Sequence, residues 1–382
     1  MPRTSLFQRT IRIGLGLLGA CAAGPLRADD GPDAGFGLRY TTEIIANVSG
    51  GAARGAGWLG RLDLHYDSGD ALFGIDGAEA YLDLFLLHGP GFSDRYAGDV
   101  QTVSNIDAPS AIRPFEAWVQ MPLAGDIRAK AGLIDLNAEF DQQTVGAPFL
   151  NSSFGIGPDI SQSGRAGPSI FPVTSPALVI ATETGGHHLR LGIFDAEPGY
   201  PDHPHRFQPG PPGRDGALLI AEAGVSLGGT ARMQIGGWRY TDRFARLDGQ
   251  GRAGSGGVYG QIEGRLAGAG KERALRAWLR AGVATAKVDP INLYVGGGAT
   301  YGSDETLFGL AIARARLGAA GRRAGIGDRD AETTIEATAL RRMTRFMAVQ
   351  PDVQYVIHPS WQARVGHALV LALRFHVSVG AD

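Results

Sequence analysis

Arginine and carboxylate side chains alternate with apolar ones in the first third of the chain, and their chemistry is that of reversible hydrogen bonding. Arginine presents five donors in a rigid plane, and a carboxylate accepts from neighbouring hydroxyl groups. Such pairs suit a solute rich in hydroxyl groups. The candidate binding residues lie on the polar faces of expected strands and are Arg61, Asp63, His65, Glu79, Arg113, Glu116, Trp118, Arg128 and Lys130. The same residues also fit a wall that merely faces water.

Other kinds of chemistry find no support in the sequence. No serine lies in a nucleophile elbow of the G-x-S-x-G kind, so we expect no enzyme. The histidine pair His187–His188 lacks a third ligand at metal-binding spacing, and we expect no metal and no other cofactor. The glycine run Gly14–Gly19 has no strand before it, which argues against a nucleotide site.

The elements that carry the candidate residues have the period of two that is typical of β-strands. Between residues 58 and 67, large apolar side chains alternate with Arg61, Asp63, His65 and Asp67. The pattern recurs at 78–86, 115–121, 232–235, 258–265 and 275–281. In the segment 115–121 we expect Phe115 to share the apolar face, opposite Glu116. Segments of about ten residues with this alternation, separated by turn residues, are typical of transmembrane barrels.

The predicted fold is therefore all-β, a transmembrane antiparallel β-barrel with long extracellular or inward-folded loops. No segment beyond the first 28 residues reaches 18 consecutive apolar residues, which leaves a closed barrel as the membrane-spanning form. The remaining length accommodates about 16 strands with their connections. We expect loops at 89–110, 151–176 and 197–215. A secreted or lipid-anchored β-sandwich that binds glycans is the alternative from a different class, because its strands also alternate.

The first 28 residues have the features of a secretory signal peptide, and residues 29–382 form the expected barrel domain. Three arginines precede an apolar run, and a small-residue cleavage site ends at Ala28. The run Leu18–Cys21 also matches a lipobox, in which Cys21 would be acylated rather than removed with the leader. Cleavage after Ala28 takes four arginines from a chain of 382 residues and charge −2, which leaves an acidic chain that does not suit nucleic acid.

Four segments resemble the carbohydrate-selective porin family of the OprB type. The most specific is the closing region, where the string 351–359 follows Glu332 and Glu336 and precedes an apolar strand at 368–375. The others are 113–118, 130–140 and 149–155, in the family's order, and the resemblance extends over roughly 40–379. The chain ends in Val379-Gly-Ala-Asp382, so we expect Phe375 to serve as the terminal aromatic of the last strand.

The resemblance implies an outer-membrane channel of about sixteen strands that passes small sugars passively into the periplasm. The expected partners are small carbohydrates and outer-membrane lipid, and the protein would work as a monomer or a homotrimer. A general diffusion porin without sugar preference remains the alternative within this class. A modest aromatic content of 8% argues against a long aromatic path for sugars.

Overall fold

Sixteen antiparallel strands form a closed barrel in the computed structural model, which describes residues 34–199, 216–268 and 273–380. Each strand pairs with its neighbours in the sequence, and the first strand pairs with the last, which closes the sheet. The strands are β1 Gly35–Gly51, β2 Gly55–Asp67, β3 Glu79–His88, β4 Ala111–Ala124, β5 Ile127–Ile134, β6 Ser175–Thr184, β7 His187–Asp195, β8 Ala217–Leu227, β9 Ala231–Ala245, β10 Arg252–Ala267, β11 Ala274–Ala284, β12 Ile291–Gly302, β13 Thr306–Leu317, β14 Ala331–Thr344, β15 Met347–Ile357 and β16 Gly366–Gly380.

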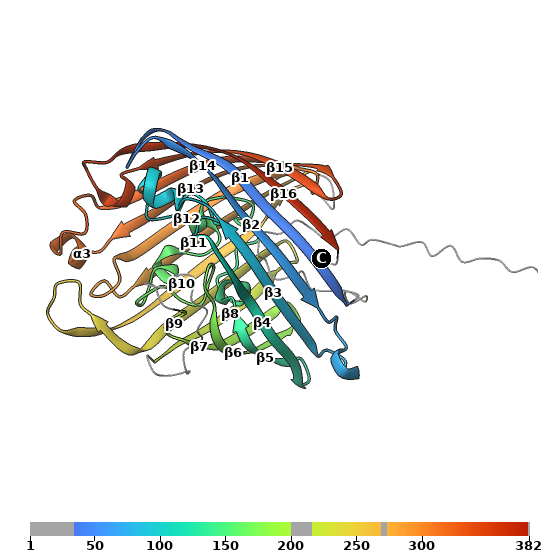
Figure 1. The fold of residues 1–382 in the computed structure, drawn as a ribbon. Helices are drawn as coiled ribbons and strands as arrows, with labels where there is room; N and C mark the ends of the chain where they lie inside the picture. Colours follow the sequence, from blue (N-terminus) through green and yellow to red (C-terminus); the bar gives the residue numbers. More distant parts are fainter. Residues whose placement is uncertain (1–33, 200–215, 269–272, 381–382) are drawn as a thin grey trace, which may run out of the picture.

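The two ends of the barrel differ in the length of their connections. The end that carries the start of β1 and the end of β16 has mostly tight turns, such as those at 125–126 and 185–186. The opposite end carries the long connections, including α3 (Ala319–Arg323), which lies at the left of Figure 1. Because bacterial barrels have short periplasmic turns and longer extracellular loops, the α3 end is the extracellular one. Among the described residues, no helix has the length and apolarity to cross a bilayer.

The alternation predicted from the sequence separates an apolar outer surface from a polar lumen. On β2, Leu64 is 47% exposed, whereas Asp63 and His65 on the other face are buried inside the barrel. The same holds on β10, where Val258 is exposed and Gln261 is buried. An exposed apolar band around a closed sheet is the arrangement that lipid requires. The closed barrel confirms the predicted fold class and excludes the β-sandwich.

Two loops fold from the extracellular end into the barrel and fill part of its lumen (Figure 1). The β3–β4 loop (89–110) contains the short helical turn Ser93–Ala97, and its apolar side chains pack against β1, β2, β15 and β16. The β5–β6 loop (135–174) contains α1 (Leu136–Glu139), the turn Ser152–Phe154 and α2 (Pro158–Ser161). Its apolar side chains pack against inward-facing residues of β6–β13, and a cavity remains in the lumen beside β1, β2 and β16.

The structure differs from the sequence-based expectation at three places. The β5–β6 loop starts at Asp135 rather than Asn151, whereas the bounds of the β3–β4 loop agree with the prediction. A bulge in β4 lies opposite Asp83 and Leu84 and turns Phe115 inward together with Glu116, because one extra residue on a strand shifts the alternation. The last strand continues to Gly380, so Phe375 lies within the strand and not at its end.

Two expectations fall on residues outside the described ones. The leader 1–28, with Cys21, precedes the first described residue. The predicted loop at 197–215 is described only as far as 199, and the connection resumes at 216 just before β8.

Candidate functional site

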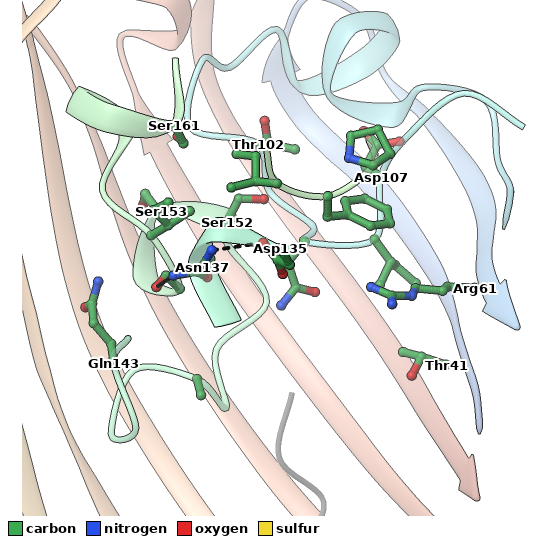
Figure 2. A pocket seen from close by; sticks show the side chains of 18 of the residues that line it. Thr41, Arg61, Thr102, Asp107, Asp135, Asn137, Gln143, Ser152, Ser153 and Ser161 are labelled. Carbon is green, nitrogen blue, oxygen red and sulfur yellow. Dashed lines mark hydrogen bonds between the residues drawn. The ribbon is translucent and has the colours of Figure 1, made fainter. Parts of the chain in front are cut away.

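A cavity of about 340 Å³ lies in the lumen between the barrel wall and the two inward loops. Figure 2 shows Thr41 and Arg61 on the strand side and Asp135, Asn137 and Ser152 on the loop side. The volume is at the lower end of the range for small-molecule sites, which is about 300–1,000 Å³. The cavity is lined on both sides by groups that donate or accept hydrogen bonds, and the site can therefore hold a small polar solute without covalent chemistry.

Arg61 of β2 is a basic residue of the cavity wall that is held by both carboxylates and aromatic rings. Its guanidinium lies 2.6 Å from a carboxylate oxygen of Asp63 and 3.4 Å from one of Asp83. The same group lies 4.8 Å from the ring centroid of Phe115 and 5.2 Å from that of Phe171. Contacts between a cation and aromatic faces add to the ion pairs and fix the guanidinium plane. The inward turn of Phe115 at the β4 bulge supplies one of these rings.

The neighbouring wall positions come from the two strands that close the barrel. The register places Thr41 of β1 between Arg61 of β2 and His376 of β16. Two residues before His376 on β16, Arg374 donates to Glu43 at 2.9 Å and to Ser104 of the β3–β4 loop at 3.2 Å. Arg39 forms no ion pair with any described residue, so its guanidinium is the wall donor most available to a solute.

The loop side of the cavity contributes two carboxyl groups with altered acidity. Asp107 accepts from the amides of Phe92 and Ser93 at 2.8 and 2.7 Å, and burial raises its pKa. Asp135 accepts from the amide of Asn137 at 2.9 Å at the start of α1. Burial raises the pKa of Asp135 to about 7, against the opposing effects of the Asn137 hydrogen bond and the Arg61 charge. The lumen therefore changes charge near neutral pH.

Glutamates of the far wall hold both loops in place by accepting hydrogen bonds from loop amides. Glu332 of β14 accepts from Val100 and Gln101 of the β3–β4 loop at 2.9 and 3.0 Å. Glu336, four residues further along β14 on the same face, accepts from Leu150 and Asn151 of the β5–β6 loop at 2.6 and 2.9 Å. Hydrogen bonds of this kind contribute about 0.5–1.5 kcal/mol each, and together these contacts hold both loops against the far wall.

Two further glutamates hold the early part of the β5–β6 loop in the same way. Glu222 of β8 accepts from the amide of Asp141 at 2.9 Å, and Glu263 of β10 accepts from that of Val145 at 2.8 Å. The hydroxyl of Tyr259 also donates to Glu222 at 2.6 Å. Loop amides are thus capped by carboxylates from several strands rather than by one.

A fully buried ion-pair cluster fixes the centre of the β5–β6 loop. Arg280 of β11 donates to Asp141 at 3.1 and 2.8 Å, and it also pairs with Asp159 of α2. Burial raises the pKa of Asp141 to about 6, although the Arg280 charge opposes this. A carboxylate and a guanidinium that are both out of contact with water depend on one another, because either charge alone would be strongly unfavourable there.

The predicted site residues fall into two groups. Arg61 and Asp63 line the cavity itself. The other seven do not line it: His65, Glu79, Arg113, Glu116, Trp118, Arg128 and Lys130 lie on β2–β5, and their placement in the barrel follows from the register.

The side chains on β2–β5 form a stacked cluster of their own. The rings of Tyr81 and Trp118 stack with centroids 5.4 Å apart, and Nζ of Lys130 lies 3.8 Å from the Trp118 ring centroid. Lys130 also pairs with Glu139 at 2.5 Å, and Trp118 donates to Glu116 at 3.1 Å. Because Tyr81 and Lys130 lie against the face of the Trp118 ring, a solute can reach the edge of the indole more easily than its face.

Sequence reasoning missed most of the loop side and the closing strands of the cavity. The missed lining residues include Arg39, Thr41, Asp107, Asp135, Asn137, Ser152, Ser153, Arg374 and His376. The alternation of Arg39, Thr41 and Glu43 in β1 was a usable signal, because period two places all three on one face. The loop residues gave no such signal, since their position depends on long-range contacts.

The family model described as "Carbohydrate-selective porin, OprB family" matches residues 54–379, which is most of the sequence. No curated protein matches the sequence at a significant level.

Solved structures agree with the barrel. A high-pH structure of Pseudomonas putida OprB superimposes with a TM-score of 0.78 at 18% identity, covering 90% of this chain and 94% of that one. A low-pH structure of the same protein gives 0.57 at 17% identity, covering 90% and 92%. A loop L8 deletion mutant of OmpT from Vibrio cholerae gives 0.51 at 11% identity, covering 91% and 100%. At these identities the likeness concerns the fold.

Proposed function

Since the chain belongs to the carbohydrate-selective porin family of the OprB type, it is an outer-membrane channel for sugars and not an enzyme, and we propose that the loop-bounded cavity is its selective constriction. The observation that carries this proposal is the lining. Three arginines, Arg39, Arg61 and Arg374, face this cavity together with the carboxyl groups of Asp63, Asp107 and Asp135. This balance of donors and acceptors suits a neutral solute with many hydroxyl groups.

Selectivity follows from replacing water around the sugar at a fixed width. A solute that enters from the extracellular end meets donors on the wall and amide and hydroxyl groups on the loops, such as Asn137 and Ser152. These groups exchange hydrogen bonds with the sugar hydroxyls as water leaves, and each exchange is close to balanced. Binding is therefore weak enough for the sugar to continue to the periplasmic side by diffusion.

Among the residues proposed from the sequence, Arg61 and Asp63 bind the sugar and the β2–β5 cluster guides it below the constriction. Trp118 offers its indole edge and Glu116, Glu79 and Lys130 offer polar groups beneath the cavity. His65, Arg113 and Arg128 complete the polar face of this wall. The cluster contributes less to sugar affinity than the cavity does, because the rings of Tyr81 and Trp118 stack on one another and Lys130 lies against the Trp118 ring.

The test is single-channel conductance in planar bilayers with sugars titrated into the bath. We expect current steps that sugar blocks in a saturable way, and we expect the block to weaken about tenfold in the Arg39→Gln variant, which removes a free donor worth about 1–1.5 kcal/mol. The matched control is Arg276→Gln, an arginine of β11 that does not line the cavity. Steps that are insensitive to sugar would instead identify a general diffusion porin.

We also propose that residues 1–28 are removed during export and that one chain contains a complete pore. The cavity is formed by a single chain, so it can operate in a monomer or in a homotrimer. The mass of the mature protein isolated from outer membranes tests how the leader is processed, since cleavage after Ala28 and acylation at Cys21 give different masses. Cross-linking in intact membranes distinguishes one copy from three.

A further inference from the structure

A basic patch lies on the outer wall of the barrel, directly beyond the apolar band at the extracellular end. Outward positions along β13 begin with Phe308, Leu310 and Ile312, which are 56%, 61% and 51% exposed. The next two outward positions on the same strand are Arg314 and Arg316, both exposed. Their side chains therefore continue the lipid-facing surface, because alternate residues of a strand share one face.

Neighbouring strands extend this patch along the rim. The register pairs Arg314 with Thr333 of β14, and Nη1 of the arginine donates to that hydroxyl at 3.1 Å. At the extracellular ends of β15 and β16, the rings of His358 and His367 lie 5.0 Å apart. The hydroxyl of Tyr355 lies 3.0 Å from Nδ1 of His367. We call Arg314, Arg316, Arg329, His358 and His367 the outer-rim patch.

Among the described residues, no member of the outer-rim patch forms an ion pair with a carboxylate. Burial lowers the pKa of His358, and the nearby charges of His367, Arg329 and Arg314 lower it further. Within the described part of the chain, neither Arg314 nor Arg316 pairs with a carboxylate, and Asp330 pairs instead with Arg322 at 3.2 Å.

An arginine on the lipid face of a barrel is unfavourable unless an anion accompanies it. The cost is about 2–4 kcal/mol at the bilayer midplane and falls towards the interface. The two arginines occupy successive outward positions just beyond Ile312, and Tyr355 lies two strands away at the level of Ile312. Paired cations at the edge of the apolar band suit an anion in the headgroup layer. Guanidinium groups bind phosphate with paired hydrogen bonds.

We propose that the outer-rim patch binds the phosphate groups of an anionic outer-leaflet lipid, whose acyl chains lie on Leu310 and Ile312. The site is separate from the sugar path, because Ala313 and Ala315, which alternate with the two arginines along β13, point inward and are fully buried. It fits a phosphorylated glycolipid better than a soluble anion, since the apolar residues below the arginines have no role in binding a free ion.

The test is binding of bisphosphorylated lipid A to the purified barrel in detergent, measured by native mass spectrometry. Each arginine at an anionic surface contributes about fivefold in affinity, so the double variant R314Q/R316Q should bind about 30-fold more weakly. The matched control is Arg341→Gln. Arg341 lies on the partner strand β14 at the periplasmic end, and it donates to Thr306 at 3.1 Å in the same cross-strand geometry.

Three results would overturn the proposal. Equal lipid affinity of R314Q/R316Q and the wild type would show that the arginines do not bind the lipid. Equal affinity of the wild type for bisphosphorylated and dephosphorylated lipid A would show that phosphate is not recognised. Displacement of the lipid by millimolar inorganic phosphate would indicate a soluble-anion site. Heat-modifiable mobility on a gel reports whether each variant is folded. If the double variant does not fold, the single variants R314Q and R316Q replace it in the binding test, and each should lose about fivefold in lipid affinity.

Discussion

Replacing Arg280 with methionine tests whether the buried ion-pair cluster holds the β5–β6 loop. The substitution keeps an unbranched apolar stem but leaves the carboxyl groups of Asp141 and Asp159 without their cation, and both are fully buried. Removing one partner of a buried pair costs about 3–5 kcal/mol. We expect R280M to lower the free energy of unfolding by about this amount, which urea unfolding followed by tryptophan fluorescence would measure.

The size of this effect should depend on pH in a defined direction. Burial already raises the pKa of Asp141 to about 6 from 3.8, and loss of Arg280 removes the charge that opposes this rise. A carboxyl group whose pKa is raised on folding destabilises the fold increasingly as pH rises above the unfolded value. The deficit of R280M should therefore be smaller at pH 5 than at pH 8.

A triple variant separates charge from packing. R280M/D141N/D159N has no buried charge in the cluster, and we expect it to recover much of the lost stability, because replacing all members of a buried ionic cluster is often close to neutral. Arg276→Met on the same strand is the control and should change stability little. A deficit in R280M below about 1 kcal/mol, or a triple variant as unstable as the single one, would refute this reasoning.

Three further results are expected. The ratio of cation to anion permeability should rise between pH 6 and pH 8 as Asp135 ionises near its pKa of about 7, and D135N should reduce the rise; an unchanged rise in D135N would contradict the assignment. Gly157→Ala should lower stability by about 1–3 kcal/mol, because a Cβ there would lie 2.0 Å from the Arg280 guanidinium carbon. The control is Gly254→Ala, whose Cβ would meet open space. Equal melting temperatures of the two variants would argue against the contact at Gly157. Leu191→Arg on the lipid face should cost about 2–4 kcal/mol in lipid bilayers, and a negligible cost would question which face meets lipid.

The barrel was predictable because its strands are specified locally. Each alternating segment shows which side chains face lipid, as Leu64 and Asp63 illustrate, and this information needs no distant partner. The limits of local reasoning appear at Phe115, where the bulge opposite β3 reverses the face, and a bulge is a property of the pair of strands rather than of one.

The candidate site was predictable only on its strand side. Arg61 and Asp63 could be placed in the lumen by period, but Asp135 and Asn137 could not, because their position depends on loop contacts with strands far along the chain. The glutamates that make these contacts were visible in the sequence as Glu332 and Glu336 of the closing motif. Their role as acceptors for loop amides required the folded arrangement.

The wall glutamates have a consequence for the order of assembly. Gln101 meets Glu332 across 231 residues of sequence, and Leu150 meets Glu336 across 186. Neither contact can form before the last strands have been added, and contacts this distant form slowly because a long chain segment must first be ordered. The constriction should therefore be the last part of the molecule to form. During insertion there is a stage at which the barrel lacks its narrow zone, when the two loops are open to protease from the extracellular end.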